Sequence, residues 1–126
     1  GAEAKLIVNL VLGLNRLVLA EGLLLSKQAG VNLDKMLEVL KDGATYSKVM
    51  DQKGQKMISE NFATEARLSQ HLKDVGLILD MGMKQDVKLP LSTLHADILR
   101  VGIDAGYADR DNSSIIKALE LYVGRK

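Results

Sequence analysis

The sequence contains no cysteine, no tryptophan and a single proline, and its aromatic residues are limited to three tyrosines and one phenylalanine. The absence of cysteine excludes disulfides, thiol catalysis and zinc–thiolate sites, and it is compatible with the cytoplasmic location that we expect. The scarcity of aromatic rings disfavours surfaces that stack nucleic-acid bases. With one proline in 126 residues, almost nothing interrupts a helix from within.

The chain also lacks an excess of charge of either sign. It has 17 lysines and arginines against 16 aspartates and glutamates, which gives a net charge of +1. This balance provides no electrostatic attraction for nucleic acid or for an anionic membrane, so we expect neither as a partner. A hydrophobic fraction of 47% is ordinary for a globular protein, and the length suits one domain with its own core.

A long apolar stretch near the N-terminus, Leu6–Leu25, resembles a membrane span. A lipid-facing helix would tolerate its polar residues poorly; these are Asn9, Asn15, Arg16 and Glu21. No basic segment precedes the stretch and no plausible cleavage site closes it, so it does not have the pattern of a signal peptide. We therefore predict a buried helix at the centre of the domain, with other helices around it.

Apolar residues at helical spacing, together with residues that begin or end helices, predict six helices. Gly30 is expected to end the first helix in a left-handed conformation, and Asn32 to cap the second. Ser69 is expected to cap the fourth, and Pro90 to begin the fifth, which Gly106 ends. The expected fold class is all-α, a helical bundle around the long central apolar helix. The helices are expected at about residues 3–29, 33–41, 47–59, 69–84, 90–105 and, after caps at 111–113, up to 123.

The most unusual polar pair lies in the opening turns. Lys5 and Asn9 are four residues apart, so on a helix they share one face. A lysine is a cationic proton donor and an asparagine offers both a donor and an acceptor, so together they could hold a hydroxyl or carbonyl oxygen of a small substrate. A lysine that acts as acid or base needs a pKa shifted towards neutrality by its surroundings. On spacing alone, a solvated lysine and an asparagine bonded to a neighbouring helix is the favoured interpretation.

Other candidate residues carry weaker signals. Lys73 and Asp74 are adjacent, and adjacent residues do not face each other on a helix, so a solvated charge pair is the simplest interpretation. His71 and His95 have no second ligand at helical spacing, and we interpret them as surface or interhelix residues rather than metal ligands. No glycine-rich phosphate loop follows a strand. The five methionines are interpreted as core residues.

Read together, the segments resemble a known family. GAEAKLIVNLVLGLNRLVLAEGLLLSKQAGVN is similar to the start of the C-terminal domain of β-hydroxyacid dehydrogenases, such as 3-hydroxyisobutyrate dehydrogenase, tartronate semialdehyde reductase and glyoxylate/succinic semialdehyde reductases. Gly1, Lys5 and Asn9 match the family's glycine–lysine–asparagine pattern. AEGLLLSKQAGVNLDKMLEVL, NFATEARLSQHLKDVGLILDMG and GYADRDNSSIIKAL resemble later family segments, in the family's order. The resemblance covers nearly the whole chain.

This resemblance implies a fold like the C-terminal domain of 6-phosphogluconate dehydrogenase-type enzymes. It also implies roles for individual residues. Lys5 would be the catalytic acid/base, and Asn9 would hold the substrate oxygen beside the Gly1 turn. Lys73 would contact the cofactor near the nicotinamide. Asp74 would orient this segment, and Phe62 would line the same cleft. Those six matches are the candidate site residues.

The resemblance further implies a domain organisation. Residues 1–126 would be a C-terminal helical domain for substrate binding and dimerisation, and the Rossmann domain that precedes it in the family is absent from this chain. NAD or NADP would be bound mainly by that missing half, so we expect the chain to be part of a longer enzyme and inactive alone. Its partners would be a small hydroxyacid or semialdehyde and further copies of itself. Two alternatives are a non-catalytic oligomerisation or interaction module of the same fold and an unrelated helical adaptor.

Overall fold

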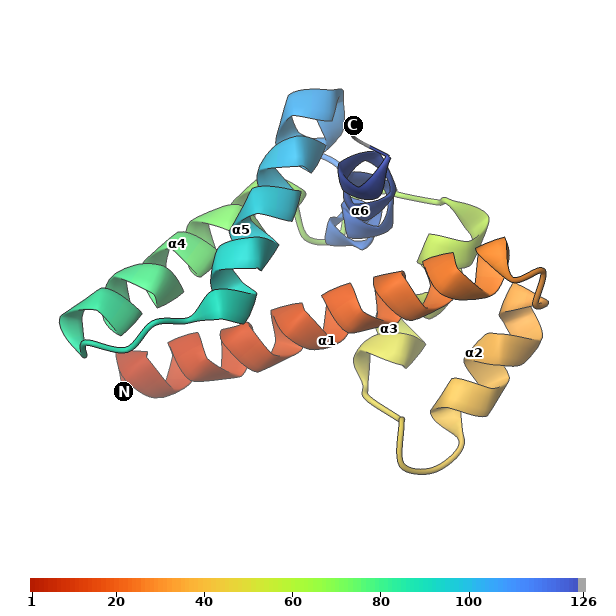
Figure 1. The fold of residues 1–126 in the computed structure, drawn as a ribbon, viewed down its shortest axis with the longest axis horizontal. Helices are drawn as coiled ribbons and strands as arrows, with labels where there is room; N and C mark the ends of the chain where they lie inside the picture. The colour runs from red at the N-terminus through yellow and green to blue at the C-terminus, as the bar shows by residue number, and fades with distance from the viewer. Residues whose placement is uncertain (125–126) are drawn as a thin grey trace.

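A single long helix, α1 (Ala2–Gln28), forms the spine of the molecule. The computed structural model describes residues 1–124, and in it α1 runs almost the full length of the domain (Figure 1). Its 27 residues correspond to about 40 Å at 1.5 Å per residue. Helix α1 stops at Ala29, and Gly30 follows with a φ of 75°. The predicted left-handed glycine at this end is therefore confirmed.

The other elements are helical as well. Within residues 1–124 no strand forms, and the predicted all-α fold class is confirmed. Asn32 caps the second helix as expected, because its side chain accepts a hydrogen bond from the backbone N–H of Lys35 at 2.9 Å. The remaining elements are α2 (Leu33–Lys41), α3 (Val49–Ser59), α4 (Leu68–Lys84), α5 (Pro90–Gly102), the π-helical turn η1 (Ile103–Tyr107), the 3₁₀ turn η2 (Asn112–Ser114) and α6 (Ile115–Val123).

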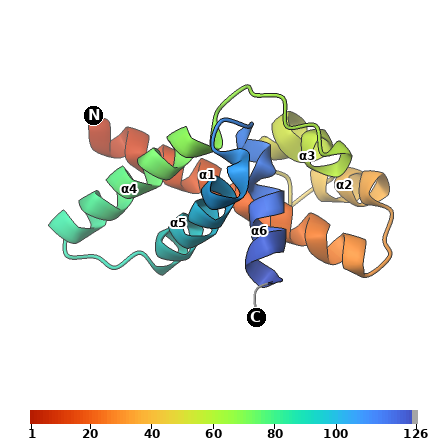
Figure 2. The same ribbon diagram turned by 90° about the horizontal axis from the view of Figure 1, so that it is seen from above.

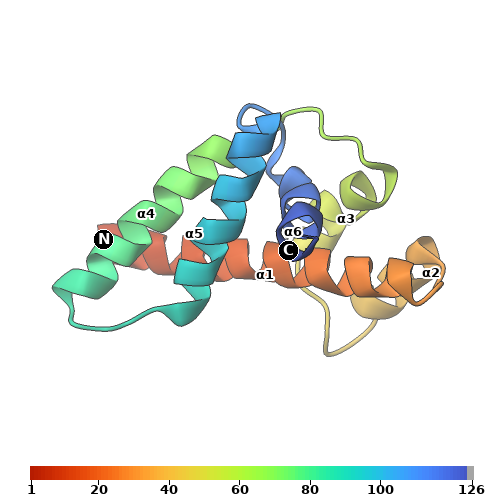
Figure 3. The same cartoon turned by 45° about the horizontal axis from the view of Figure 1, so that its top comes forward.

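The helices pack on α1 in two groups. Helices α4 and α5 form a hairpin over its N-terminal half, and α2 and α3 pack around its C-terminal half (Figures 1 and 2). Helix α6 lies between the two groups and packs on both α1 and α5 (Figure 3). The core sits where these helices meet, and its largest fully buried apolar side chains are Leu23, Met57, Leu68, Val75, Leu99 and Ile115.

The prediction that other helices surround α1 is wrong for its outer side. Val18 and Leu25 are 69% and 70% exposed, and Ile7, Val8 and Val11 are also exposed. The reason is that the other helices pack on one side of α1 and leave a stripe of apolar residues open. By length and composition alone α1 could span a membrane, and 22% of its most apolar window is buried.

The start of α4 differs from the sequence-based prediction, which gave Ser69 as the cap. The helix begins one residue earlier, after Arg67, and no side chain caps it. Its first backbone donors are instead satisfied by another segment: the N–H of Leu68 donates to the carbonyl of Arg110 at 3.0 Å, and that of Ser69 to Ala108 at 2.9 Å. A tertiary contact therefore replaces the local cap.

A buried carboxylate, Asp111, holds the loop before α4 in place. Its side chain accepts hydrogen bonds from the backbone N–H groups of Glu65, Ala66 and Ser113 at 3.0–3.1 Å, and pairs with Lys53 at 3.0 Å. Burial alone would raise the pKa of Asp111, but these donors and the Ser113 hydroxyl hold its pKa well below the usual range. The sequence predicted Asp111 only as a cap; it also joins α3, the 60–67 loop and η2.

Candidate functional site

The predicted Lys5–Asn9 pair faces a hollow between α1 and α4. The two residues lie one turn apart on α1, Lys5 exposed and Asn9 half-buried. Across from them stands α4, which contributes Asp74. We call this space the lysine hollow; it is lined by Ala2, Lys5, Leu6, Asn9, Asp74, Leu77, Asp80, Met81 and Lys84.

A second hollow adjoins the first, further along α1. It shares Asn9 and Asp74 with the lysine hollow, so the two are adjacent, and together we call them the α1–α4 groove. Its distinguishing side chain is Arg16, two turns beyond Asn9 on the same face of α1. We call this space the arginine hollow; it is lined by Asn9, Leu12, Arg16, Ala66, Arg67, Gln70, His71, Asp74 and Asn112.

Three of the six candidate residues meet in this groove: Lys5, Asn9 and Asp74. The Asp74 carboxylate accepts a hydrogen bond from the Gln70 amide at 3.3 Å, which holds it on the α1 side of α4. Lys73 is exposed on the same helix but does not belong to the groove lining.

The other two candidate residues lie outside the groove lining. Gly1 is exposed and precedes the first turn of α1, where it is the N-cap without a side-chain hydrogen bond. Phe62 is 4% exposed, and its ring packs edge-on against Tyr107 with the centroids 6.1 Å apart. The Arg110 guanidinium lies 6.0 Å from the same ring. Phe62 therefore packs in the interior in this structure, and a role for it in the cleft stays a prediction.

The two histidines form a buried pair rather than surface residues. His71 is 8% and His95 is 3% exposed, and their ring centroids are 5.0 Å apart between α4 and α5. Burial, reinforced by the nearby Arg16 charge, lowers the pKa of His71 to about 3 and that of His95 to about 4, so both are neutral at pH 7. The interhelix interpretation is confirmed and the surface interpretation is wrong, because α1 covers the pair from below at Gly13.

Arg16 is the residue of this groove that the sequence did not single out as a site. Its Nε and Nη1 atoms are buried and have no hydrogen-bond partner among the described residues. Burial lowers its pKa, and the charge of Asp111 partly opposes that shift. A signal was present in the spacing, because Lys5, Asn9 and Arg16 follow one another at intervals of four and seven, as residues on one helix face do.

The groove offers polar chemistry without a metal. Within residues 1–124, no cluster of three or more histidine or carboxylate side chains could hold a metal ion. An ammonium group and an amide one turn apart can bind one oxygen atom from two directions, and the ammonium can also transfer a proton to it. The arrangement therefore suits a small molecule with a carbonyl or hydroxyl group.

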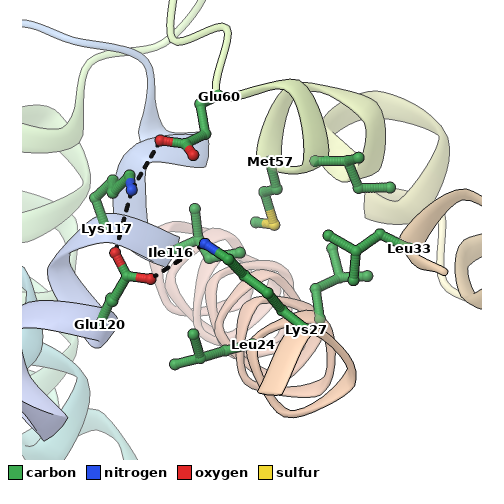
Figure 4. A pocket seen from close by; sticks show the side chains of 10 residues that line it. Leu24, Lys27, Leu33, Met57, Glu60, Ile116, Lys117 and Glu120 are labelled. Atoms are coloured by element: carbon green, nitrogen blue, oxygen red, sulfur yellow. Dashed lines mark hydrogen bonds and ion pairs between the residues drawn. The ribbon is translucent and has the colours of Figure 1, made fainter. Parts of the chain in front are cut away.

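A separate small hollow lies where α1, α3 and α6 meet (Figure 4). Its floor is apolar, with Met57 and Ile116 among the lining residues. Lys117 bridges Glu60 at 2.7 Å and Glu120 at 3.1 Å, and Glu120 continues to Lys27 at 3.7 Å. Because every charge in this chain of ion pairs faces an opposite charge, the hollow has no group that calls for a ligand.

Comparison with known proteins identifies the family. The profile described as NAD-binding of NADP-dependent 3-hydroxyisobutyrate dehydrogenase matches residues 1–119, which include all six candidate residues. The chain therefore belongs to the 3-hydroxyisobutyrate dehydrogenase family. It is 30% identical over 126 residues to glyoxylate/succinic semialdehyde reductase 2, chloroplastic, of Arabidopsis thaliana. It is 33% identical over 125 residues to 2-(hydroxymethyl)glutarate dehydrogenase of Eubacterium barkeri.

The 3-hydroxyisobutyrate dehydrogenase family also provides structural matches. A crystal structure of 3-hydroxyisobutyrate dehydrogenase from Salmonella typhimurium superimposes with a TM-score of 0.89 at 27% identity, covering 93% of this chain and 41% of that one. The alignment covers 100% of this chain but 35% of the Arabidopsis reductase, and 98% of it but 42% of the Eubacterium dehydrogenase. The chain thus corresponds to less than half the length of these relatives.

Proposed function

We propose that this chain is the C-terminal helical domain of an NAD(P)-dependent oxidoreductase that interconverts a small β-hydroxyacid and its semialdehyde. The observation that carries the proposal is the placement of Lys5 and Asn9 in one hollow, opposite Asp74, within a chain that matches the family over residues 1–119. The dinucleotide-binding domain lies in the remainder of the enzyme. The alternative, a non-catalytic oligomerisation module, gives no reason for a lysine and an asparagine to face the groove together.

In the proposed reaction, the residues of this chain handle the substrate oxygen. When bound, the reduced nicotinamide of NAD(P)H would supply a hydride to the carbonyl carbon of the semialdehyde. Lys5 donates a proton from Nζ to the carbonyl oxygen as negative charge develops there, and accepts it back in the oxidation direction. Asn9 donates a hydrogen bond to the same oxygen and fixes its position. A helix is a rigid support for such a pair.

The residues of this chain can make a minor contact with NAD(P), but they do not form its main binding site. Lys73 is exposed on α4 next to Asp74, which lines the groove, so its ammonium group is available to an anionic part of the dinucleotide. The sequence has no glycine-rich fingerprint that could surround the pyrophosphate. The proposal therefore assigns Lys73 an auxiliary role, and the 126-residue chain alone is expected to show no NAD(P)H turnover.

The decisive experiment is a Lys5→Ala substitution in the full-length enzyme, assayed with a panel of 3-hydroxyacids and semialdehydes. Loss of a general acid typically lowers the rate by about 10²–10⁴-fold, so we expect kcat to fall at least 100-fold. Because Lys5 is exposed, the melting temperature should stay within about 2 °C of the wild type.

The matched control is Lys35→Ala, which removes an exposed lysine from α2, away from the groove. We expect this variant to retain wild-type activity. If Lys5→Ala also retained wild-type kcat, the acid/base assignment would be wrong. If the full-length enzyme turned over no member of the panel, the substrate class would be wrong. Turnover by the isolated 126-residue chain would contradict the placement of the cofactor domain outside it.

A further inference from the structure

Arg16 carries a positive charge that the described part of the protein does not neutralise directly. Its Nε and Nη1 atoms are buried and unpaired, and no ion pair joins it to a described carboxylate. Charged hydrogen-bond donors without partners are costly in the interior of a protein. A site that keeps such a group has either a structural use for it or a ligand that completes it.

The neighbours of Arg16 do not supply the missing negative charge. His71 and His95 are neutral at pH 7 and cannot accept an ion pair. Asp111 is the acid whose charge acts on Arg16, but its carboxylate already pairs with Lys53 and accepts several backbone hydrogen bonds. Asp74 lines the same hollow and is not within ion-pair distance of Arg16. The lining also includes Arg67, but its guanidinium pairs with Asp109 at 3.8 Å, so the cation of this hollow that lacks an ion pair is Arg16.

A second unpaired polar group belongs to a residue that lines the same hollow, Asn112. The Asn112 side chain is 6% exposed, and its Oδ1 is buried without a hydrogen-bond partner among the described residues. Rotation of the amide by 180° would present its two N–H donors to the hollow instead. The arginine hollow has a volume of ≈ 140 Å³, several times the roughly 30 Å³ that one water molecule occupies in the liquid. It therefore has room for a small organic anion.

The distance from Asn9 indicates which part of a ligand would reach Arg16. Seven residues of helix separate the two by about 10 Å along the axis, and the Cα–Cβ bonds of a helix tilt towards its N-terminus, which for Arg16 is the direction of Asn9. An extended five-carbon chain spans about 5 Å between its end carbons. One molecule of this size could hold its oxygen at Asn9 and a far carboxylate at Arg16.

We propose that the arginine hollow binds a carboxylate, with Arg16 and Asn112 as the donors. This carboxylate lies at the far end of a four- or five-carbon substrate whose reacting oxygen is at Lys5 and Asn9. The inference rests on the proposed function for the identity of the ligand, and it adds a preference for hydroxyacids with a second, remote carboxylate. A planar guanidinium group binds a carboxylate through two parallel hydrogen bonds, which a lysine at the same position cannot reproduce.

The first test measures binding to the 126-residue chain, so it does not depend on turnover. Glutarate, acetate and sulfate are titrated into ¹⁵N-labelled chain, and the shifts of Arg16 Nε–H and the Asn112 amide are followed. We expect saturable glutarate binding that is lost in Arg16→Gln and weakened at least tenfold in Arg16→Lys. Arg100→Gln, which removes an exposed arginine on α5, is the matched control and should bind as the wild type does.

Several results would overturn the proposal. Equal binding of glutarate, acetate and sulfate would show that the hollow takes up an adventitious ion only. Binding that persists in both folded Arg16 variants would place the anion elsewhere. No binding of glutarate at 50 mM or so would show that the hollow is closed to small carboxylates, with the buried arginine completed by another part of the enzyme. Circular dichroism shows whether each variant is folded. If Arg16→Gln does not fold, the test is made with Arg16→Lys.

The second test uses the full-length enzyme and separates this proposal from the proposed function. In Arg16→Lys, kcat/KM for a hydroxyacid with a remote carboxylate should fall at least tenfold through KM, while that for a monocarboxylic hydroxyacid stays unchanged. Equal losses for both substrates would contradict the carboxylate assignment and leave the role of Lys5 intact. Conversely, we expect Lys5→Ala to abolish activity in the full-length enzyme and to leave glutarate binding unchanged.

Discussion

The buried histidine pair couples the stability of the groove to pH. His71 and His95 are neutral in the folded protein because burial and the Arg16 charge lower their pKa values to about 3 and about 4. In the unfolded chain a histidine titrates near pH 6.5, so below that pH the unfolded state binds more protons than the folded state. The stabilisation of the folded state by these neutral histidines is therefore complete above pH 6.5 and is lost as the pH falls towards 4.

We expect the free energy of unfolding to decrease by about 2 kcal/mol per histidine between pH 6.5 and pH 5. Urea unfolding at several pH values measures this slope in a range where carboxylates contribute little. His71→Gln, which cannot titrate, should reduce the slope by about half. An unfolding free energy that does not change over this range would show that the pair is protonated, or solvated, in the folded protein.

At the scale of elements, the close approach of α1 to the histidine pair depends on one glycine. A Cβ atom at Gly13 would lie 2.3 Å from Nε2 of His71 and 3.1 Å from Cε1 of His95. Neither ring can easily move away, because both are buried against each other. Helix α1 can therefore pack this closely on α4 and α5 only where it has no side chain.

The expected result for Gly13→Ala is a loss of about 1–3 kcal/mol of stability from overpacking, despite the better helix propensity of alanine. Gly76→Ala is the matched control, because it is also within a helix and nothing lies within 4 Å of its added Cβ. That variant should be more stable, by up to about 1 kcal/mol. Thermal or urea unfolding of the two variants gives the comparison. If both substitutions had the same effect, the packing at Gly13 would not be as tight as described.

The elements that were predicted correctly are those whose ends depend on local chemistry. Gly30 needs a left-handed conformation, Asn32 caps through its own side chain and Pro90 begins a helix, so each signal is contained in a few residues. The start of α4 was predicted wrongly because its donors are satisfied by the carbonyls of Ala108 and Arg110. A sequence read locally contains no information about such a distant partner.

In the candidate site, too, the features that depend on nearby residues were predictable and those that depend on distant residues were not. Lys5 and Asn9 were predicted to share a face because helical spacing is local, and they do. That Asp74 lies opposite them depends on the packing of α4 on α1; the family resemblance gave Asp74 only as a residue that orients the Lys73 segment. The burial of Arg16 Nε and Nη1 could not be predicted, because it depends on how α4, the 60–67 loop and η2 pack beside α1.

At the scale of the whole molecule, the uncovered side of α1 is an apolar surface available for assembly. Ile7, Val11, Val18 and Leu25 form an exposed stripe at helical spacing along one face. Contiguous apolar surface of this kind is typical of a protein–protein interface. We therefore expect copies of the chain to associate through α1, as a dimer or a higher oligomer.

Sedimentation velocity over a range of concentrations tests this association. Val18→Lys places a charge within the stripe, at a residue that is 69% exposed, and should shift the chain towards monomer without changing its helix content. Val39→Lys changes a similarly exposed residue, 62% exposed on α2, and should leave the association unaltered. A wild-type chain that sediments as a monomer at every concentration would rule out α1 as a self-association surface.

The ion pair between Lys53 and Asp111 has a kinetic consequence. Its partners are 58 residues apart in the chain, so it can form only after a long loop has closed, and loop closure slows folding relative to the formation of single helices. During refolding, helices will therefore exist before the 60–67 loop is anchored. Because Ala66, Arg67 and Asn112 form one wall of the arginine hollow, we expect this wall to take its final shape only after the helices have formed.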